Sequence, residues 1–309
     1  MSNLGDLSIQ QLQCFVAVAE EGQFTRAADR LHVAQPSVSF QVRRMEAAVG
    51  ARLFHRGRGP AALTDAGLEL LPLARRVLAD LSEIITRAGD LQGLRSGHVA
   101  IGATPSLATA LLPGLLARFH RRYPGITLEV TERDSLQLAG ALEDGTLDIA
   151  IAIFPLRHPD VEHVALATEE LVVVVAPDHP LATRSDVRVG DLDGVPMIMF
   201  HEGYDLRTST LEAFDDAGIV PTVSVEGAEI GSVLSMVAAG LGAAVVPSLI
   251  IAEASGVHVL HVTEPRLERQ IGLLRHSGRS LSLAAAAMCD EIGAHLAESG
   301  WPQASPDNR

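Results

Sequence analysis

From residue 98 onward, short apolar runs rich in β-branched residues alternate with longer segments of helical periodicity. The runs are apolar on both sides, which is typical of strands in a sheet that is covered on both faces. Nine strands are predicted: HVAIGA, ITLEVTE, LDIAIAI, LVVVVAP, VPMIMF, TVSVEG, AAVVP, VHVL and QIGLLR. The helices expected between most of them cover 107–122, 135–143, 206–217, 229–239 and 281–298. This alternation restricts the back of the chain to an α/β fold with mainly parallel sheets.

The first fifty residues follow a different pattern and predict three amphipathic helices. The first covers about 8–20, with Ser8 as its N-cap. The second follows Thr25, a good N-cap residue, and reads TRAADRLHV. The third, QPSVSFQVRRMEAAVG, has Pro36 in its first turn, where a missing N–H costs nothing. The second and third helices indicate a helix-turn-helix over about 24–43.

The outward side of the third helix carries side chains that suit the major groove of DNA. Amide and hydroxyl groups can hydrogen-bond base edges, a ring can contact a thymine methyl, and guanidinium groups can bind guanine or phosphate. The outward positions are Gln35, Ser37, Ser39, Phe40, Arg43 and Arg44. The next segment, ARLFHRGRGPAALT, predicts a wing of two strands with Arg56 and Arg58 at its tip. A solvated helix face with no role in nucleic-acid binding is the alternative.

Charge is unevenly distributed along the chain, whose net charge is -14. Residues 1–95 hold 11 Arg and 10 acidic residues, a net charge of +1. Residues 96–309 hold 13 Arg and 28 acidic residues, a net charge of -15. Because an acidic surface repels nucleic acid, DNA binding is expected of the front segment only.

Residues 64–95 predict a long helix with an apolar heptad seam. The seam consists of Leu70, Ala74, Val77, Leu81, Ile84, Ala88 and Leu91, of which Leu70, Val77, Leu81, Ile84 and Leu91 are the expected dimer contacts. A seam of three repeats after a DNA-binding motif favours a dimerisation helix, because a symmetric operator needs two readers. The alternative is a core stripe of the chain's own domain. Pro72 cannot donate to the carbonyl of Leu68, so a kink or break is expected there.

The segment FTRAADRLHVAQPSVSFQVRRMEAAVGARLFHR, followed by LTDAGLELLP, resembles the N-terminal domain of LysR-type transcriptional regulators. The resemblance is dense in this segment, and the rest of the chain follows the family's layout at lower similarity. Together with the outward positions, it implies DNA contacts by Thr25, Gln35, Pro36, Ser37, Ser39, Phe40, Arg43, Arg44, Arg56 and Arg58. Two positions depart from the family: Ala34 replaces the usual serine cap, and Phe40 stands where Arg is frequent.

The resemblance also implies an architecture: an all-α winged helix-turn-helix domain, a long linker helix and an α/β effector domain of two lobes. The effector domain is expected to be similar to type-2 periplasmic binding proteins. The expected segments are 1–65 for the DNA-binding domain, 66–95 for the linker and dimerisation helix, and 96–309 for the effector domain, with lobe I at about 96–165 and 268–301 and lobe II at about 166–267.

Ligands of open α/β sheets bind beyond the carboxyl ends of the strands, which here means between the lobes. The candidates for effector binding are Thr104, Ser106, Glu132, Phe200, Glu202, Arg207, Glu226 and Gly227. Thr104 to Ser106 follow a strand and open a helix, so an anion could bind there; ordinary capping by Thr104 is the alternative. A small organic acid is therefore the expected effector, although Glu202 and Glu226 would favour an amino-bearing ligand if both faced it.

Patterns for catalysis and metal binding are absent from the sequence: it contains no GxSxG, no Walker loop and no HExxH. No catalytic residue, metal ligand or cofactor is expected, and the chain is not expected to be an enzyme. The cysteines, Cys14 and Cys289, form no CxxC and suit a reducing cytoplasm. Peroxide sensing, known in one branch of the family, needs a cysteine pair in the effector domain, where only Cys289 lies, so thiol switching is not expected.

The prediction is a cytoplasmic LysR-type regulator, because the start lacks the features of a signal peptide. Its expected partners are double-stranded operator DNA, a small-molecule effector, further copies of itself in a homodimer or homotetramer, and RNA polymerase as an additional candidate. One alternative is a soluble binding or transport protein of the periplasmic type. Another is an enzyme on that scaffold, which would need a nucleophile or paired carboxylates between the lobes.

Overall fold

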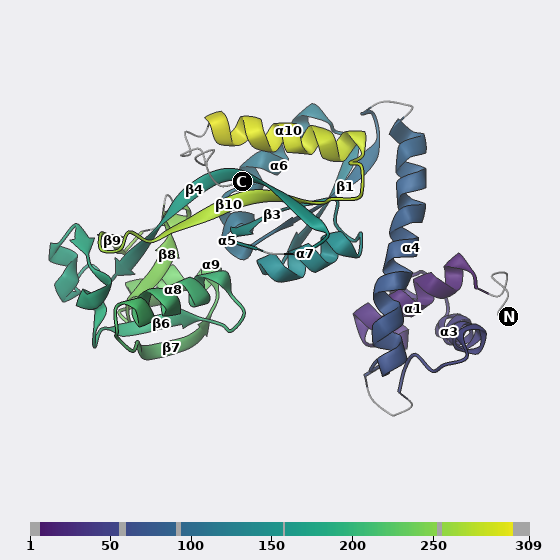
Figure 1. The fold of residues 1–309 in the computed structure, drawn as a ribbon, viewed down its shortest axis with the longest axis horizontal. Helices are drawn as coiled ribbons and strands as arrows, with labels where there is room; N and C mark the ends of the chain where they lie inside the picture. Colours follow the sequence, from purple (N-terminus) through teal and green to yellow (C-terminus); the bar gives the residue numbers. More distant parts are fainter. Residues whose placement is uncertain (1–6, 56–59, 91–93, 157, 252–254, 299–309) are drawn as a thin grey trace. The chain divides into compact units, whose positions relative to one another are not determined.

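The computed structural model describes residues 7–55, 60–90, 94–156, 158–251 and 255–298. The chain forms two compact units, and its elements are labelled in Figure 1. The first unit comprises Met1–Leu91 and Glu143–Thr146, and the second comprises Gln92–Leu142 and Leu147–Arg309. Among the described residues, no helix combines the length and the apolar character that a membrane crossing requires.

The first unit begins with helices α1 (Ile9–Glu21), α2 (Phe24–Arg30) and α3 (Gln35–Val49). The predicted cap of α1 is confirmed, because the Ser8 hydroxyl accepts the Gln11 N–H and the Gln11 side chain accepts the Ser8 N–H. The predicted cap of α2 is wrong: Gln23 is the N-cap, and Thr25 lies inside the helix. The helix starts earlier because the Phe24 ring packs against Phe54 with centroids 5.6 Å apart.

A single core holds these helices against the linker helix α4 (Asp65–Asp90). Phe15 and Val38 are fully buried in this core, and Ala74 of α4 joins them at 3% exposure. The predicted break at Pro72 is not found, since α4 continues through it as one helix. The Leu68 carbonyl that Pro72 leaves without its helical donor belongs to a residue that is 60% exposed, so water can satisfy it.

The predicted wing is reduced to a short antiparallel contact in the described residues. Phe54 and Leu63 form an isolated bridge, and the His55 N–H donates to the Ala62 carbonyl. Arg56 and Arg58 lie outside the described residues.

Lobe I of the second unit is a sheet with helices on both faces. Its parallel strands are β1 (Gly97–Ala103), β2 (Ile126–Glu132) and β3 (Ile149–Phe154). Val99 and Ile101 point to the side of α5 (Pro105–Ala110), α6 (Leu112–Arg122) and α10 (Leu283–Glu298), whereas Ala100 faces α7 (Ser135–Glu143). The single helix predicted over 107–122 is divided at Leu111, because a second helix starts there with Pro113 in its first turn.

Lobe II has its own apolar core, built around two parallel strands, β6 (Pro196–Phe200) and β7 (Thr222–Ala228). Its other elements are α8 (Asp205–Asp216), α9 (Ile230–Ala238), β5 (Asp186–Val187), β8 (Ala244–Pro247), β9 (His258–Val262) and the 3-10 turns η2 (Pro180–Thr183), η3 (Val189–Leu192) and η4 (Ser248–Ile251). The predicted strands of this lobe are confirmed, while β5 was not predicted.

Two long strands connect the lobes, as Figure 1 shows for β4 (Val161–Val175) and β10 (Glu268–His276). They run antiparallel to each other; β10 is also antiparallel to β3, and β4 to β8 and β9. The expectation of mainly parallel sheets is therefore wrong: the sheet β2-β1-β3-β10-β4-β9-β5 is mixed. The reason is that the chain enters lobe II on one strand and returns on its neighbour in the opposite direction.

Because Gly242 has no side chain, the segment before β8 can pass close to the start of β6. A Cβ atom there would lie 2.6 Å from the Pro196 carbonyl oxygen, and its φ of +156° is rare for L-residues. We predict that Gly242→Ala lowers the free energy of unfolding by about 1–3 kcal/mol. Gly140→Ala, in the interior of α7 where no atom lies within 4 Å of the added Cβ, should instead raise it by about 0.5–1 kcal/mol. Urea unfolding of both variants checks these opposite signs, and equal effects would contradict the steric explanation.

Candidate functional site

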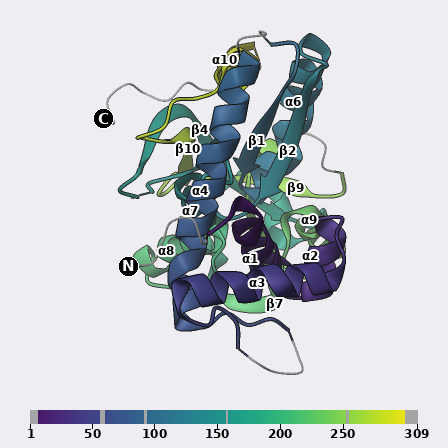
Figure 2. The same cartoon turned by 90° about the vertical axis from the view of Figure 1, so that its right-hand side faces the viewer.

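The exposed side of α3 presents a polar surface with one aromatic ring on it. Gln35 donates from Nε2 to the Ser39 hydroxyl at 2.9 Å, and the Arg43 Nε donates to the Ser39 carbonyl. Phe40 is 53% exposed, and the Arg44 guanidinium lies 6.0 Å from the centroid of its ring. Figure 2 shows α3 uncovered on its outer side. This surface offers hydrogen-bonding groups, an apolar ring and positive charge together.

The remaining predicted DNA contacts of this unit that the structure describes are also accessible. Pro36 and Ser37 open α3 on its exposed side, and Thr25 is exposed on α2. Val38 and Val42 alternate with the exposed positions of α3 and are buried in the core. The packing of the apolar face therefore determines which side of α3 remains free.

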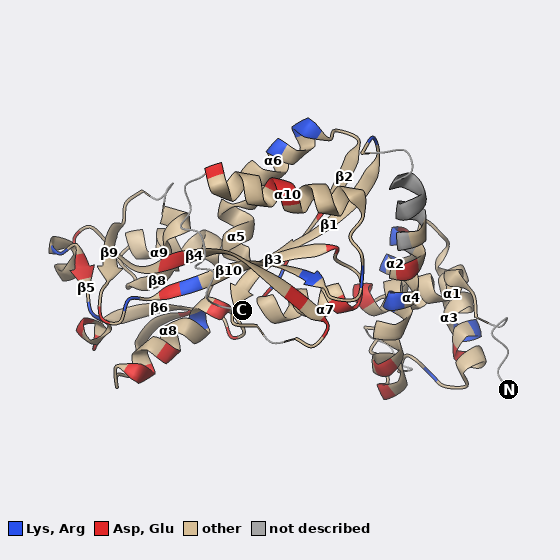
Figure 3. Cartoon of the chain, turned by 45° about the horizontal axis from the view of Figure 1, so that its top comes forward, with Lys and Arg blue, Asp and Glu red and all other residues tan. Residues whose placement is uncertain are grey.

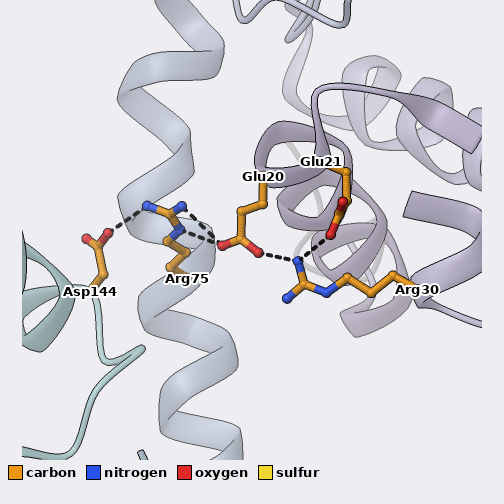
Figure 4. A network of polar contacts seen from close by, with 5 residues as sticks. All are labelled: Glu20, Glu21, Arg30, Arg75 and Asp144. Carbon is orange, nitrogen blue, oxygen red and sulfur yellow. Dashed lines mark hydrogen bonds and ion pairs between the residues drawn. The ribbon is translucent and has the colours of Figure 1, made fainter. Parts of the chain in front are cut away.

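A network of ion pairs fixes α1 and α2 to the linker helix (Figure 4). Glu20 of α1 lies 2.7 Å from Arg30 Nη1 of α2 and 3.1 Å from Arg75 Nη2 of α4. Arg30 also contacts Glu21, and Arg75 contacts Asp144 at 2.9 Å, in the short segment that clusters with this unit. Glu20 thus joins three helices of the first unit by one carboxylate.

The predicted seam of α4 divides into two parts. Near its start, Leu70 packs with Ala74 against the core of the chain's own unit. Further along, Val77 and Ile84 are 46% and 64% exposed, and Leu81 is half-buried. Leu91 lies outside the described residues. Among the described seam residues, the apolar side chains that the single chain leaves exposed are therefore in the later part of the seam.

In the second unit, polar side chains come together from three turns and two connecting strands. Thr104 and Ser106 lie at the turn from β1 to α5, Ser135 at the start of α7, and Tyr204 and Asp205 at the start of α8. Glu169 and Arg269 join them from β4 and β10. We call these seven residues the inter-lobe cluster.

The centre of the inter-lobe cluster is a buried ion pair between the connecting strands. Arg269 Nη2 and Glu169 Oε2 lie 2.7 Å apart, and each side chain is only 4% exposed. Glu169 also accepts the Leu249 N–H at 2.9 Å, and Arg269 donates to the Ser106 hydroxyl at 2.9 Å. The pair is therefore bonded to lobe I through Ser106 and to η4 through Leu249.

Two hydroxyl groups of the inter-lobe cluster are buried without a hydrogen-bond partner among the residues that the structure describes. They belong to Thr104, which is 3% exposed, and Tyr204, which is 4% exposed. Burial raises the pKa of Tyr204, so its hydroxyl stays protonated. The alternative role of Thr104 as an ordinary cap is not supported, because its side chain makes no capping bond. A buried hydroxyl without a partner loses its hydration free energy, and a bound polar ligand could restore it.

A direct hydrogen bond joins the two lobes beside these hydroxyls. The Ser135 hydroxyl of lobe I donates to Asp205 Oδ2 of lobe II at 2.7 Å, and it accepts the Ile153 N–H at 3.1 Å. Burial raises the pKa of Asp205, although the bond from Ser135 opposes this effect.

Several predicted effector residues have other roles. Arg207 donates to the Phe200 carbonyl at 2.8 Å and pairs with Glu226 at 2.7 Å, so its guanidinium is already occupied. The Phe200 ring is 2% exposed and stacks on Tyr204 with centroids 5.1 Å apart. Glu132 and Glu202 are exposed, and Gly227 adopts a positive φ of 82°.

Sequence reasoning missed the buried pair of Glu169 and Arg269. The available signal was the charged residues at the starts of two otherwise largely apolar segments, TEELVVVV and ERQIGLLR. In the described part of the chain, no three His, Cys, Asp or Glu side chains are grouped to hold a metal ion.

Both units match known protein families. Residues 9–68 match the family described as bacterial regulatory helix-turn-helix protein, lysR family, and residues 92–297 match the LysR substrate binding domain. The chain is 32% identical to the uncharacterized HTH-type transcriptional regulator YybE of Bacillus subtilis, covering 94% of this chain and 99% of that protein. It is 30% identical to the DNA-binding transcriptional dual regulator OxyR of Escherichia coli, covering 94% and 96%.

Solved structures are similar over the same length. A full-length OxyR point variant from Pseudomonas aeruginosa has a TM-score of 0.72 and 26% identity, with 94% of this chain and 97% of that chain covered. Full-length CbnR in complex with its target DNA has a TM-score of 0.69 and 25% identity, with 94% and 100% covered.

Removal of either unpartnered hydroxyl is expected to stabilise the protein, whereas removal of a buried polar group usually destabilises it. Because each buried hydroxyl lacks a bond to the part of the chain that the structure describes, Thr104→Val and Tyr204→Phe should each raise the free energy of unfolding of the ligand-free protein, by about 1 kcal/mol. Thr210→Val is the matched control: Thr210 is equally buried, but its hydroxyl donates to the Leu206 carbonyl at 2.6 Å, so its loss should destabilise the protein. Denaturant unfolding measures all three, and destabilisation by Thr104→Val or Tyr204→Phe would contradict the assignment.

Proposed function

The chain belongs to the LysR family of transcriptional regulators, and we propose that α3 reads operator DNA while the inter-lobe cluster of the second unit binds the effector. The observation that carries the proposal is the pair of partnerless buried hydroxyls beside a direct contact between the lobes. The helix-turn-helix match over 9–68 favours this function over a soluble transport protein with the same two-lobed fold. An operator-binding protein of this kind would act in the cytoplasm.

We propose that different residues on the exposed side of α3 contact the bases and the phosphates of DNA. Gln35, Pro36, Ser37 and Ser39 would contact base edges, since their side chains lie near the start of the helix on its free side. Arg43 and Arg44 would bind phosphate or guanine, and Arg56 and Arg58 would contact phosphates from the wing. Thr25, exposed on α2, would contact the backbone.

The position of Phe40 favours an apolar contact with DNA. Its ring has no hydrogen-bonding group and is half uncovered, so the partner it fits is a thymine methyl rather than a guanine. The Arg44 guanidinium near the ring can bind phosphate at the same time.

We propose that two copies pair through the uncovered part of the α4 seam. Val77 and Ile84 are apolar, exposed and on one face, and pairing would remove them from water. Two helix-turn-helix units would then match a two-fold symmetric operator. Pairing of such dimers into tetramers and contact with RNA polymerase are separate proposals. Both rest on the family membership.

Peroxide sensing by a thiol pair is not favoured, although several relatives are named hydrogen peroxide-inducible genes activators. The only cysteine of the second unit is Cys289, and burial raises the pKa of its thiol to about 11. Burial also raises the pKa of Cys14, in the core of the first unit. At neutral pH both sulfurs are protonated, and a thiol reacts with peroxide far more slowly than a thiolate.

Selection of bound duplexes from a random DNA pool, followed by sequencing, tests the function. We predict that Phe40→Ala loses about 1–3 kcal/mol of binding at one base step, because only that step presents the methyl group to the ring. Arg56→Ala and Arg58→Ala should weaken all sequences alike and reduce the slope of log affinity against log salt by about one unit each. Uniform loss with Phe40→Ala would show that the ring stabilises the helix instead.

The dimer is tested by an acidic substitution in the seam. Ile84→Asp places a charge where pairing would desolvate it, so the dimer should dissociate and operator affinity should fall. Val220→Asp makes a comparable change at a valine that is 83% exposed in the second unit, and it should leave the assembly unchanged. Sedimentation analysis reports the result; an unchanged oligomer with Ile84→Asp would place the contact elsewhere.

A further inference from the structure

Charged groups of both signs lie around the Tyr204 hydroxyl. The charged groups that act on it are Arg269, Glu132, Glu229 and Asp205. Arg269 is already paired with Glu169 at 2.7 Å, so its charge is largely compensated. Three carboxylates remain, and Figure 3 shows that acidic residues also occupy α8 and α10 of the same unit. Glu132 and Glu229 are exposed and screened by water, so Asp205 is the carboxylate that a ligand beside this hydroxyl would meet.

The partners of these carboxylates leave that charge uncompensated. Asp205 accepts the neutral Ser135 hydroxyl at 2.7 Å, which satisfies one lone pair without supplying charge. Glu229 lies 3.9 Å from the His201 imidazole, a distant contact that is ionic only when the ring is protonated. Arg207, which follows Tyr204 closely in the sequence, already pairs with Glu226.

The two buried hydroxyls of the inter-lobe cluster offer further polar contacts to a ligand. Thr104 and Tyr204 are each more than nine-tenths buried, and each has an oxygen without a partner among the described residues. They come from different lobes, and Arg269 bonds Ser106, two residues after Thr104, while its charge acts on Tyr204. Hydroxyl oxygens can accept a hydrogen bond from an ammonium group as well as donate one.

We propose, on the basis of the function proposed above, that the effector carries a protonated amino group which pairs with Asp205 and contacts the Thr104 and Tyr204 hydroxyls. A charge-assisted bond to a half-buried carboxylate is stronger than a neutral one. An organic acid without an amine, the class expected from the sequence, would instead face Asp205 as a like charge. The amine also bridges residues of both lobes, so binding can alter the contact that Ser135 now makes with Asp205.

Matched sets of small molecules test the class without knowledge of the natural effector. Each set keeps one carbon skeleton and changes the end group: putrescine, butanediol and succinate, then cadaverine, pentanediol and glutarate, then alanine and lactate. The readout is the thermal unfolding midpoint of the full chain at millimolar ligand. Within each set the amine should raise the midpoint by several degrees more than the alcohol or the acid, because a ligand stabilises only the state that binds it.

Two variants assign the effect to the site. Asp205→Asn keeps the shape and the acceptor for Ser135 but removes the charge, so amine affinity should fall about tenfold or more. Asp216→Asn, at an exposed position near the end of the same helix, should leave the amine affinity unchanged. Tyr204→Phe provides a second loss of binding if Asp205→Asn proves unstable.

The inference is overturned if the acids give the larger shifts, if no amine shifts the midpoint, or if Asp205→Asn binds amines as the wild type does. Selection of duplex DNA by the same proteins tests the proposed regulatory function independently of the ligand class. A chain that selects one DNA sequence but prefers acids retains the regulatory function and loses only the ligand class. A chain that selects no sequence loses the function itself.

Discussion

The ion pair between Glu169 and Arg269 is the contact on which the arrangement of the second unit depends. Its two residues lie opposite each other on the antiparallel strands that connect the lobes. Burial makes a lone charge very unfavourable, so each residue requires the other, and loss of one partner of such a pair typically destabilises a protein by about 3–5 kcal/mol. The remaining bonds of the pair to Ser106 and Leu249 fix the turn after β1 and the turn η4 beside it.

The same pair explains why the neighbouring hydroxyls can stay unsatisfied. Arg269 bonds Ser106, two residues after Thr104, and this bond helps to fix the turn that carries Thr104. Strain and lost hydrogen bonds of this kind are tolerated at functional sites because the surrounding structure stabilises them. The Ser135 hydroxyl bonds Asp205 directly between the start of α7 and the start of α8, and a ligand can compete for that carboxylate.

Local sequence patterns predicted most helices and strands. They could not predict contacts between residues that are far apart in the chain. The cap of α1 depends on residues three positions apart, and the strands of both lobes depend on short apolar runs. The first half of β4 was missed because EHVALATEE mixes charge with apolar residues. Glu169 and Arg269 are 100 residues apart, so only strand register reveals the pair. Arg207 was assigned to the ligand because its partner Glu226 lies 19 residues later, on β7, and the sequence does not reveal how α8 packs beside that strand.

The central claim is that two copies of this chain read a symmetric operator with α3. Hydroxyl-radical footprinting of the full chain on a selected duplex tests it most directly, because the footprint records both the number and the spacing of the protected sites. The account predicts two protected half-sites on one face of the DNA, separated by about one helical turn of 10 base pairs or a multiple of it. A single protected half-site, or uniform protection on every sequence, would contradict it.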